Sequence, residues 1–184
     1  MGHAKGDAVT AKALLVDDRR ENLVALEAIL QGLAVETIAV TSGEEALKRL
    51  LVDDFAVILL DASMPTMDGF ETATHIKQRE RTRHIPIIFL TALDYDARLA
   101  FRGYQIGAVD FITKPFDPWV LRSKVAVFID LWQKSAELTA QAMDQMALQD
   151  AVTKALALLA SRDNEGAVSV LRAVQAKHAV PRMR

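Results

Sequence analysis

Cysteine is absent from the 184-residue chain, which excludes disulfide bonds, thiolate metal sites and cysteine nucleophiles. No apolar run approaches the 18 residues that would indicate a membrane-spanning helix. Neither sign of charge dominates, because 22 Lys and Arg stand against 24 Asp and Glu, so the whole chain has no general attraction for nucleic acid or anionic lipid. Residues 1–10 lack the apolar core of a secretory signal. We therefore expect a soluble, cytoplasmic protein without a membrane partner.

The composition is that of a globular protein, with 51% apolar and 25% charged residues. The length suits one domain and an appendage. We divide the chain into a flexible tail at residues 1–10, a domain at residues 11–130 and a helical extension at residues 131–184.

Short apolar segments alternate with helical patterns through the domain. The expected strands are residues 13–16, 35–40, 56–60, 85–90 and 110–113, and the expected helices are residues 21–33, 44–51, 69–80, 94–107 and a last one from residue 118. Ser42, three residues before Glu45, predicts a capping box at the start of the second helix. Several strands are almost uniformly Val, Ile and Leu, which is typical of parallel strands covered on both faces. The pattern predicts an α/β fold, a right-handed doubly wound parallel sheet of five strands with its ligand site at the strands' carboxyl ends.

The extension contains neither Gly nor Pro between residues 131 and 161. We expect the last helix of the domain to continue to about residue 161, a length of roughly 65 Å from residue 118, followed by a short helix at residues 167–178. A heptad pattern with a polar middle allows a coiled coil with a second copy or a partner helix. The alternative is that the extension folds back on the domain, or that residues 162–184 pack onto the long helix as a hairpin.

Polar side chains follow four of the predicted strands. Asp17 and Asp18 end the first strand, Asp61 the third, Thr91 the fourth and Lys114 the fifth. Taken singly, each is an ordinary turn, cap or loop residue. Together they bring three carboxylates to one edge, where mutual repulsion is relieved by a hard cation such as Mg²⁺. A carboxylate beside Mg²⁺ can attack phosphorus, while an ammonium and a hydroxyl bind the remaining oxygens.

Four segments carry a family resemblance. They are residues 14–19 (LLVDDR), 59–70 (LLDASMPTMDGF), 88–92 (IFLTA) and 107–116 (GAVDFITKPF). With these motifs, residues 12–130 resemble the receiver domain of two-component response regulators. The resemblance implies the flavodoxin-like strand order 2-1-3-4-5 and a stoichiometric phosphoacceptor that promotes its own phosphotransfer and dephosphorylation, rather than an enzyme.

The resemblance also assigns roles to residues of the strand ends. Asp61 would accept a phosphoryl group from a sensor histidine kinase or a phosphotransfer protein. Asp18 and Asp61 would bind Mg²⁺ directly, Asp17 through water, and the backbone carbonyl of Ser63 would complete the coordination.

Further roles concern the phosphorylated state. Lys114 would pair with the phosphoryl group, Thr91 would turn its hydroxyl onto it, and Phe111 would be the switch aromatic, at a position where the family often has tyrosine. Ser63 and Leu93 occupy the two positions that tune dephosphorylation. Because Leu93 is apolar and would screen attacking water, we expect a long-lived phosphoryl state.

The sequence says less about how the extension passes on the signal than about the receiver. Residues 131–184 are nearly balanced in charge and show no helix-turn-helix and no signature of a cyclase, phosphodiesterase or methylesterase, so we expect homodimerisation or binding of a helical partner protein, and not DNA binding. Residues 155–174 bear a faint likeness to small RNA-binding helical outputs. A Mg²⁺-dependent phosphatase of the haloacid dehalogenase type is another alternative, although it would have a second aspartate where this chain has Ser63. An unphosphorylated scaffold is the last, and the complete set of strand-end residues argues against it.

Overall fold

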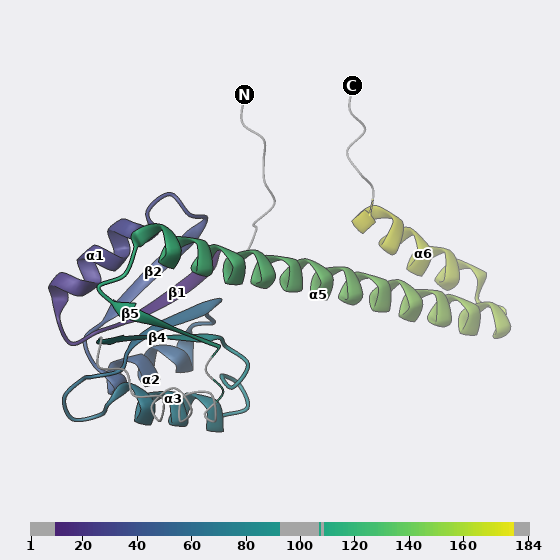
Figure 1. Ribbon diagram of the computed structural model, residues 1–184. Coiled ribbons are helices and arrows are strands. Elements are labelled where there is room, and N and C mark those ends of the chain that lie inside the picture. Colours follow the sequence, from purple (N-terminus) through teal and green to yellow (C-terminus); the bar gives the residue numbers. More distant parts are fainter. Residues whose placement is uncertain (1–9, 93–106, 108, 179–184) are drawn as a thin grey trace. The chain divides into compact units, whose positions relative to one another are not determined.

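The computed structural model describes residues 10–92, 107 and 109–178. Its five strands are β1 (Ala11–Val16), β2 (Val35–Val40), β3 (Val57–Asp61), β4 (Ile87–Ala92) and β5 (Asp110–Lys114). All four strand pairs are parallel, and the order across the sheet is β2-β1-β3-β4-β5 (Figure 1). The predicted doubly wound α/β fold and its strand order are therefore confirmed.

The described helices are α1 (Arg20–Leu30), α2 (Gly43–Val52), α3 (Gly69–Gln78), α5 (Pro118–Ala160) and α6 (Asn164–His178). Helices α1 and α5 cover one face of the sheet, and α2 and α3 cover the other (Figure 1). The helix expected at residues 94–107 lies outside the described residues apart from its last position. None of the helices in the described ranges has a stretch apolar enough, at sufficient length, to cross a bilayer.

The uniformly apolar strands are explained by two hydrophobic cores, one on each face of the sheet. All five residues of β3 are buried. Alternate residues of the central strands contribute to different cores: Leu14, Ile58 and Leu60 pack with α2 and α3, whereas Leu15 and Leu59 pack with α1 and the start of α5. Period-2 alternation of side chains thus produces no polar face here, because both faces are covered.

Local signals position the helices close to where the sequence placed them. The Ser42 side chain accepts a hydrogen bond from the Glu45 amide at 3.2 Å, as an N-cap should. The Glu45 carboxylate does not complete the predicted capping box, because it accepts from the amide of Thr41 instead. Asp68 caps α3 through the Glu71 amide at 2.7 Å.

Some element bounds differ from those predicted. Helix α1 ends at Leu30 rather than at residue 33, and Gly32 has φ of +82°, a left-handed conformation that ends the helical path. Strand β4 begins at Ile87 rather than at residue 85, since Pro86 has no amide hydrogen to join the ladder. Both shifts leave the strand-end residues at the same edge.

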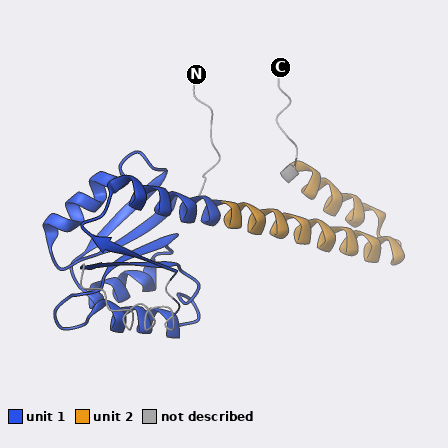
Figure 2. Ribbon diagram, in the orientation of Figure 1, with its two compact units in different colours: residues 1–133 blue, residues 134–184 orange. Residues whose placement is uncertain are grey.

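The chain divides into two compact units, residues 1–133 and residues 134–184 (Figure 2). Helix α5 contributes residues to both and ends at Ala160, one residue from the predicted end. In the second unit, Ala155 of α5 and Ala167 of α6 are 3% and 1% exposed, which indicates that the two helices pack together. The alternative that the end of the chain packs onto the long helix as a hairpin therefore describes residues 164–178. The predicted domain boundary after residue 130 stays a prediction.

Candidate functional site

The carboxyl ends of β1, β3, β4 and β5 bring the five predicted strand-end residues to one edge of the sheet. Asp17 directly follows β1, Asp61 is the last residue of β3, and Lys114 is the last residue of β5. Thr91 is paired with Thr113 across β4 and β5, so Thr91 and Lys114 are one residue out of register. Parallel pairing therefore makes one site from residues up to 97 positions apart in the sequence.

Lys114 connects two of the carboxylates directly. Its Nζ donates to Oδ2 of Asp17 at 2.8 Å and to Oδ1 of Asp61 at 2.9 Å. Asp17 is fully buried, the Asp61 side chain is 10% exposed, and the Lys114 side chain is 27% exposed. The ammonium is thus held against both acids and remains accessible from solvent.

The site includes one residue that sequence reasoning missed. The Nδ2 of Asn22 donates to Oδ1 and Oδ2 of Asp17 at 2.9 and 3.0 Å, and the backbone amide of Arg19 donates to Oδ1 at 3.0 Å. Asn22 lies in the first turn of α1, five residues after Asp17. The available signal was an amide side chain at the start of a helix that directly follows an acidic strand end.

The electrostatic state of the site follows from burial and charge. Burial raises the pKa of Asp61, and the neighbouring charges of Asp17 and Asp18 raise it further, against the opposing effect of Lys114. Burial alone would lower the pKa of Lys114, but its hydrogen bonds to Asp17 and Asp61 outweigh this and the pKa is raised. Burial is therefore the main reason that the pKa of Asp61 is raised, although Lys114 lies beside it.

The three acids have the geometry and chemistry of a cation site. One carboxylate oxygen from each of Asp17, Asp18 and Asp61 lies within 4.8 Å of the other two. Asp18 is exposed while the other two are buried, so a bound ion would be reached from solvent and keep water ligands. An all-oxygen, partly hydrated site suits a hard divalent ion such as Mg²⁺.

The remaining predicted residues surround this cluster to different extents. Thr91 is 8% exposed, and Phe111 stacks on Phe89 with ring centroids 5.2 Å apart. Ser63 is exposed two residues beyond Asp61. Leu93, the second residue expected to tune dephosphorylation, lies outside the described residues.

The loop after β3 is held close to the acceptor strand by Gly69. Its amide donates to the carbonyl of Ala62 at 3.1 Å, and a Cβ at this position would lie 2.2 Å from the backbone oxygen of Asp61. Only glycine allows the first turn of α3 to approach the strand this closely. The close packing of α3 against the end of β3 therefore depends on glycine at this position.

Comparison with known proteins supports the same interpretation. The family model of the response regulator receiver domain matches residues 13–126. Response regulator PleD of Caulobacter vibrioides is 39% identical over 117 residues, which are 64% of this chain and 26% of PleD. A probable cyclic di-GMP phosphodiesterase of Vibrio cholerae is 35% identical over 176 residues, covering 86% of this chain and 38% of that protein. The chain thus spans 26–38% of the length of these two relatives.

Solved structures agree in fold. The chemotaxis protein CheY4 of Vibrio cholerae is 29% identical with a TM-score of 0.60, over 64% of this chain and 97% of CheY4. The receiver domain of the sensor histidine kinase PA1611 of Pseudomonas aeruginosa, solved with a magnesium ion in its active-site cleft, is 29% identical with a TM-score of 0.59, over 66% of this chain and 99% of that domain. With the family model matching well over half of its residues, this chain belongs to the response regulator receiver domain family.

Proposed function

We propose that this protein is a phosphorylation-activated response regulator whose Asp61 accepts a phosphoryl group from the phosphohistidine of a sensor histidine kinase or phosphotransfer protein. The observation that carries the proposal is the double hydrogen bond of Lys114 to Asp17 and Asp61 beside a third acid. That arrangement presents a carboxylate nucleophile, an ammonium and a cation site on one solvent-accessible edge.

The magnesium ligands would be the three clustered acids and a backbone carbonyl. Asp18 and Asp61 would bind the ion directly, Asp17 would bind it through water, and the backbone carbonyl of Ser63 would be the fourth group of the chain to hold it. When bound, Mg²⁺ neutralises negative charge on the transferred group. The support for this assignment is the 4.8 Å cluster, the raised pKa of Asp61, which burial and the neighbouring acids cause, and the mixture of buried and exposed carboxylates.

The transfer itself uses this chain's own side chains. A carboxylate oxygen of Asp61 attacks phosphorus, the phosphorus–nitrogen bond of the donor breaks, and the imidazole nitrogen keeps the electron pair. Lys114 turns from the Asp61 carboxylate to the phosphoryl oxygens, which it can do because it already lies 2.9 Å from the attacking group. Asn22 and the Arg19 amide keep Asp17 in place while its ammonium partner moves.

Phosphorylation then shifts the population of a switch on the β4–β5 edge. Thr91 donates its hydroxyl to the phosphoryl group, and Phe111 occupies the space behind it. The stacking of Phe111 on the fully buried Phe89 links this movement to the core under α2 and α3. The shift is only as large as the difference in phosphoryl contacts between the two states.

The signal leaves through protein association of the helical extension rather than through DNA. Support comes from the two helices of residues 134–178 and from their charges, since five basic residues there are matched by five acidic ones. A surface that follows a phosphate backbone needs an excess of positive charge, which these helices do not have.

The Vibrio cholerae relative favours a second candidate for the output. Because 86% of this chain is about 158 residues, its alignment must extend at least about 30 residues beyond residue 126, where the family model ends. At least part of the extension therefore aligns with a protein named as a probable cyclic di-GMP phosphodiesterase. Hydrolysis of cyclic di-GMP by this purified chain would establish that candidate and contradict the stoichiometric, non-enzymatic role.

The experiment that tests the acceptor is incubation with acetyl phosphate and Mg²⁺, followed by intact mass and light scattering. We expect a mass gain of one phosphoryl group in the wild type and none in Asp61→Asn. The matched control is Asp54→Asn, because Asp54 is an exposed carboxylate paired with Arg81 on the surface. An unmodified wild type, or a modified Asp61→Asn variant, would contradict the assignment.

The lifetime of the product tests the two tuning positions. With Leu93 apolar, we propose that the phosphoryl group outlasts the time of the experiment. A half-life of seconds in the purified protein with Mg²⁺ would contradict this, and Leu93→Ala should shorten the lifetime while leaving the mass gain intact.

A further inference from the structure

The second unit carries an exposed apolar surface formed by both of its helices. On α5, Val152, Leu156 and Leu159 are 42%, 61% and 46% exposed, and on α6, Val168 and Leu171 are 46% and 45% exposed. We call these five side chains the hairpin face. Half-exposed large apolar residues gathered on neighbouring helices mark an interaction surface.

Helix geometry places the five side chains on one side of the hairpin. At about 100° per residue, the three α5 residues lie roughly 40–100° to one side of the buried Ala155, and the two α6 residues lie roughly 40–100° to the same rotational side of the buried Ala167. The helices are joined by three residues, 161–163, so they run antiparallel. In an antiparallel pair of right-handed helices, equal rotations away from the contact lead to the same face, so the two stripes form one surface.

The hairpin face contains no charge. From residue 145 to residue 175, the polar residues at the same rotations are uncharged amides, namely Gln145, Asn164 and Gln175. A charged partner would find no side chain of opposite charge to pair with on the hairpin face. A second copy of the same surface, in contrast, can pack against it without like-charge repulsion.

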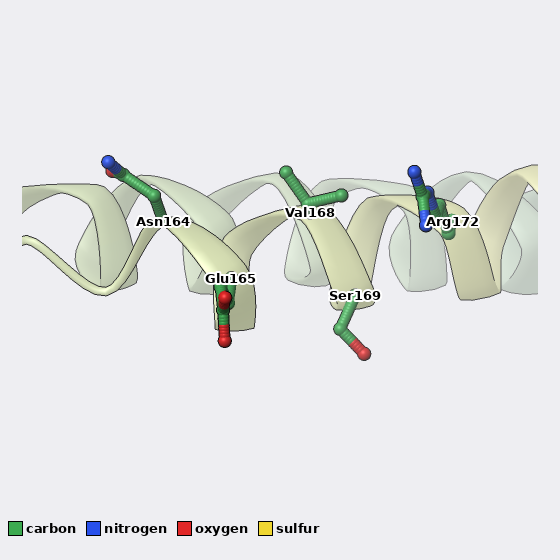
Figure 3. A pocket seen from close by; sticks show the side chains of 5 residues that line it. All are labelled: Asn164, Glu165, Val168, Ser169 and Arg172. Atoms are coloured by element: carbon green, nitrogen blue, oxygen red, sulfur yellow. The ribbon is translucent and has the colours of Figure 1, made fainter.

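The edge of the face supplies a charge pattern that matches itself. Glu165 and Arg172 lie along α6 with Val168 between them, about 160° and 140° around the helix from Ala167. All three line one surface pocket, with the Glu165 side chain turned to the side opposite Val168 (Figure 3). Glu165 and Arg172 are seven residues apart, about 10.5 Å along the axis, which is too far for a pair within one helix. When a second α6 runs antiparallel across Val168, Glu165 of each copy meets Arg172 of the other.

The apolar stripe of α5 has the same symmetry. In an antiparallel α5 pair centred between residues 155 and 156, Val152 of one copy meets Leu159 of the other, and Leu156 lies at the centre. The midpoint of the α6 pattern, between residues 168 and 169, is within two residues of Ala167, just as the α5 midpoint is beside Ala155. Since these alanines mark the contact between the helices, one twofold axis can serve both pairs.

We infer that a second copy of this chain docks on the hairpin face, so that two hairpins form an antiparallel four-helix bundle with two Glu165–Arg172 pairs across its edge. Five half-exposed side chains are by themselves much less than a standard interface, which covers about 800 Å² and roughly 20–30 residues per partner. The dimer is accordingly reversible rather than obligate. This inference rests on the proposed associating role of the extension and identifies its partner and geometry.

The test uses charge reversal in the full chain, with dissociation measured by sedimentation equilibrium over a concentration series. Glu165→Arg places two arginines opposite each other in both pairs, and Arg172→Glu does the same with two glutamates. We expect either single variant to raise the dimer dissociation constant about tenfold or more. The double variant restores attraction in every pair and should dimerise as the wild type does.

Mixing Glu165→Arg with Arg172→Glu gives a sharper test. The introduced arginine of the first variant then faces the introduced glutamate of the second, and the Arg172 that the first retains faces the Glu165 that the second retains. We expect a heterodimer from two proteins that are each monomeric, with helix content by circular dichroism equal to the wild type.

Two results would overturn the inference in distinguishable ways. If the wild type dimerises and neither single charge reversal changes its dissociation constant, this geometry is overturned and association through α5 alone is left. A wild type that stays monomeric with and without acetyl phosphate would overturn the associating role too, while the mass gain at Asp61 is read independently.

Discussion

The ammonium of Lys114 should stabilise the folded protein mainly by neutralising the acids beside it. At 2.8 and 2.9 Å, each contact with Asp17 or Asp61 represents about 6 kcal/mol of attraction at an effective dielectric constant near 20. Most of this offsets the desolvation of the charges. Because about a quarter of the Lys114 side chain is exposed, we expect Lys114→Met to lower the free energy of unfolding by about 2–4 kcal/mol at neutral pH without divalent ions.

A second substitution separates charge from packing. Oxygens of Asp17 and Asp61 within 4.8 Å of each other repel by about 3 kcal/mol at the same dielectric constant, and this repulsion is uncompensated once Lys114 is gone. Asp61→Asn removes it, so the double variant should recover most of the lost stability. The coupling free energy in the double-mutant cycle is therefore expected to be about 2 kcal/mol or more.

The assay is urea denaturation followed by far-ultraviolet circular dichroism, in EDTA and then over a series of Mg²⁺ concentrations. A ligand at about 100 times its dissociation constant adds about 2.7 kcal/mol. Magnesium should stabilise Lys114→Met more than the wild type, because the ammonium no longer competes for the same oxygens. The reasoning is refuted if Lys114→Met loses less than about 1 kcal/mol in EDTA, or if the two substitutions are simply additive.

Three further perturbations test other features. Gly69→Ala places a Cβ 2.2 Å from the backbone oxygen of Asp61, so we expect a loss of about 2–5 kcal/mol in urea denaturation; Gly43→Ala, whose short contacts are all to side chains, should lose clearly less. Without metal, the pKa of Asp61 is raised by burial, so the folded state binds more protons than the unfolded state and stability falls as pH rises through that pKa. The stability of the wild type relative to Asp61→Asn should therefore decline from acid to neutral pH, and a rising difference would contradict the direction. Arg122→Met removes two hydrogen bonds from Nη1 to carbonyls at the end of α1 and should cost about 1–2 kcal/mol, whereas an unchanged denaturation midpoint would show that water replaces them.

The strand-end residues were predictable because all strands of a parallel sheet have their carboxyl ends on the same side. Asp17, Asp61, Thr91 and Lys114 each directly end or follow an apolar segment, so their convergence required only that the segments pair in parallel. The cap at Ser42 was equally local, since it depends on an amide three residues away.

The features that escaped prediction depend on side-chain direction and on local backbone conformation. Asn22 stands at the start of a helix after an acidic strand end, but this position alone does not show that its amide reaches both oxygens of Asp17. The early end of α1 follows from the left-handed Gly32, and the carboxylate of Glu45 accepts from Thr41, one residue before the expected amide.

The sequence by itself determined the fold class, the family and the chemical identity of the site, because all three follow from local patterns and from the order of elements along the chain. Only the tertiary structure decided that Lys114 holds Asp17 and Asp61 together, since these distances depend on how strands far apart in sequence pair. It also showed that Asn22 supports Asp17, which depends on the direction of the Asn22 side chain. It also decided which face of the extension remains exposed. A heptad pattern states which residues share a side of one helix, but the packing of α6 at Ala155 and Ala167 determines which of those sides is left for a partner.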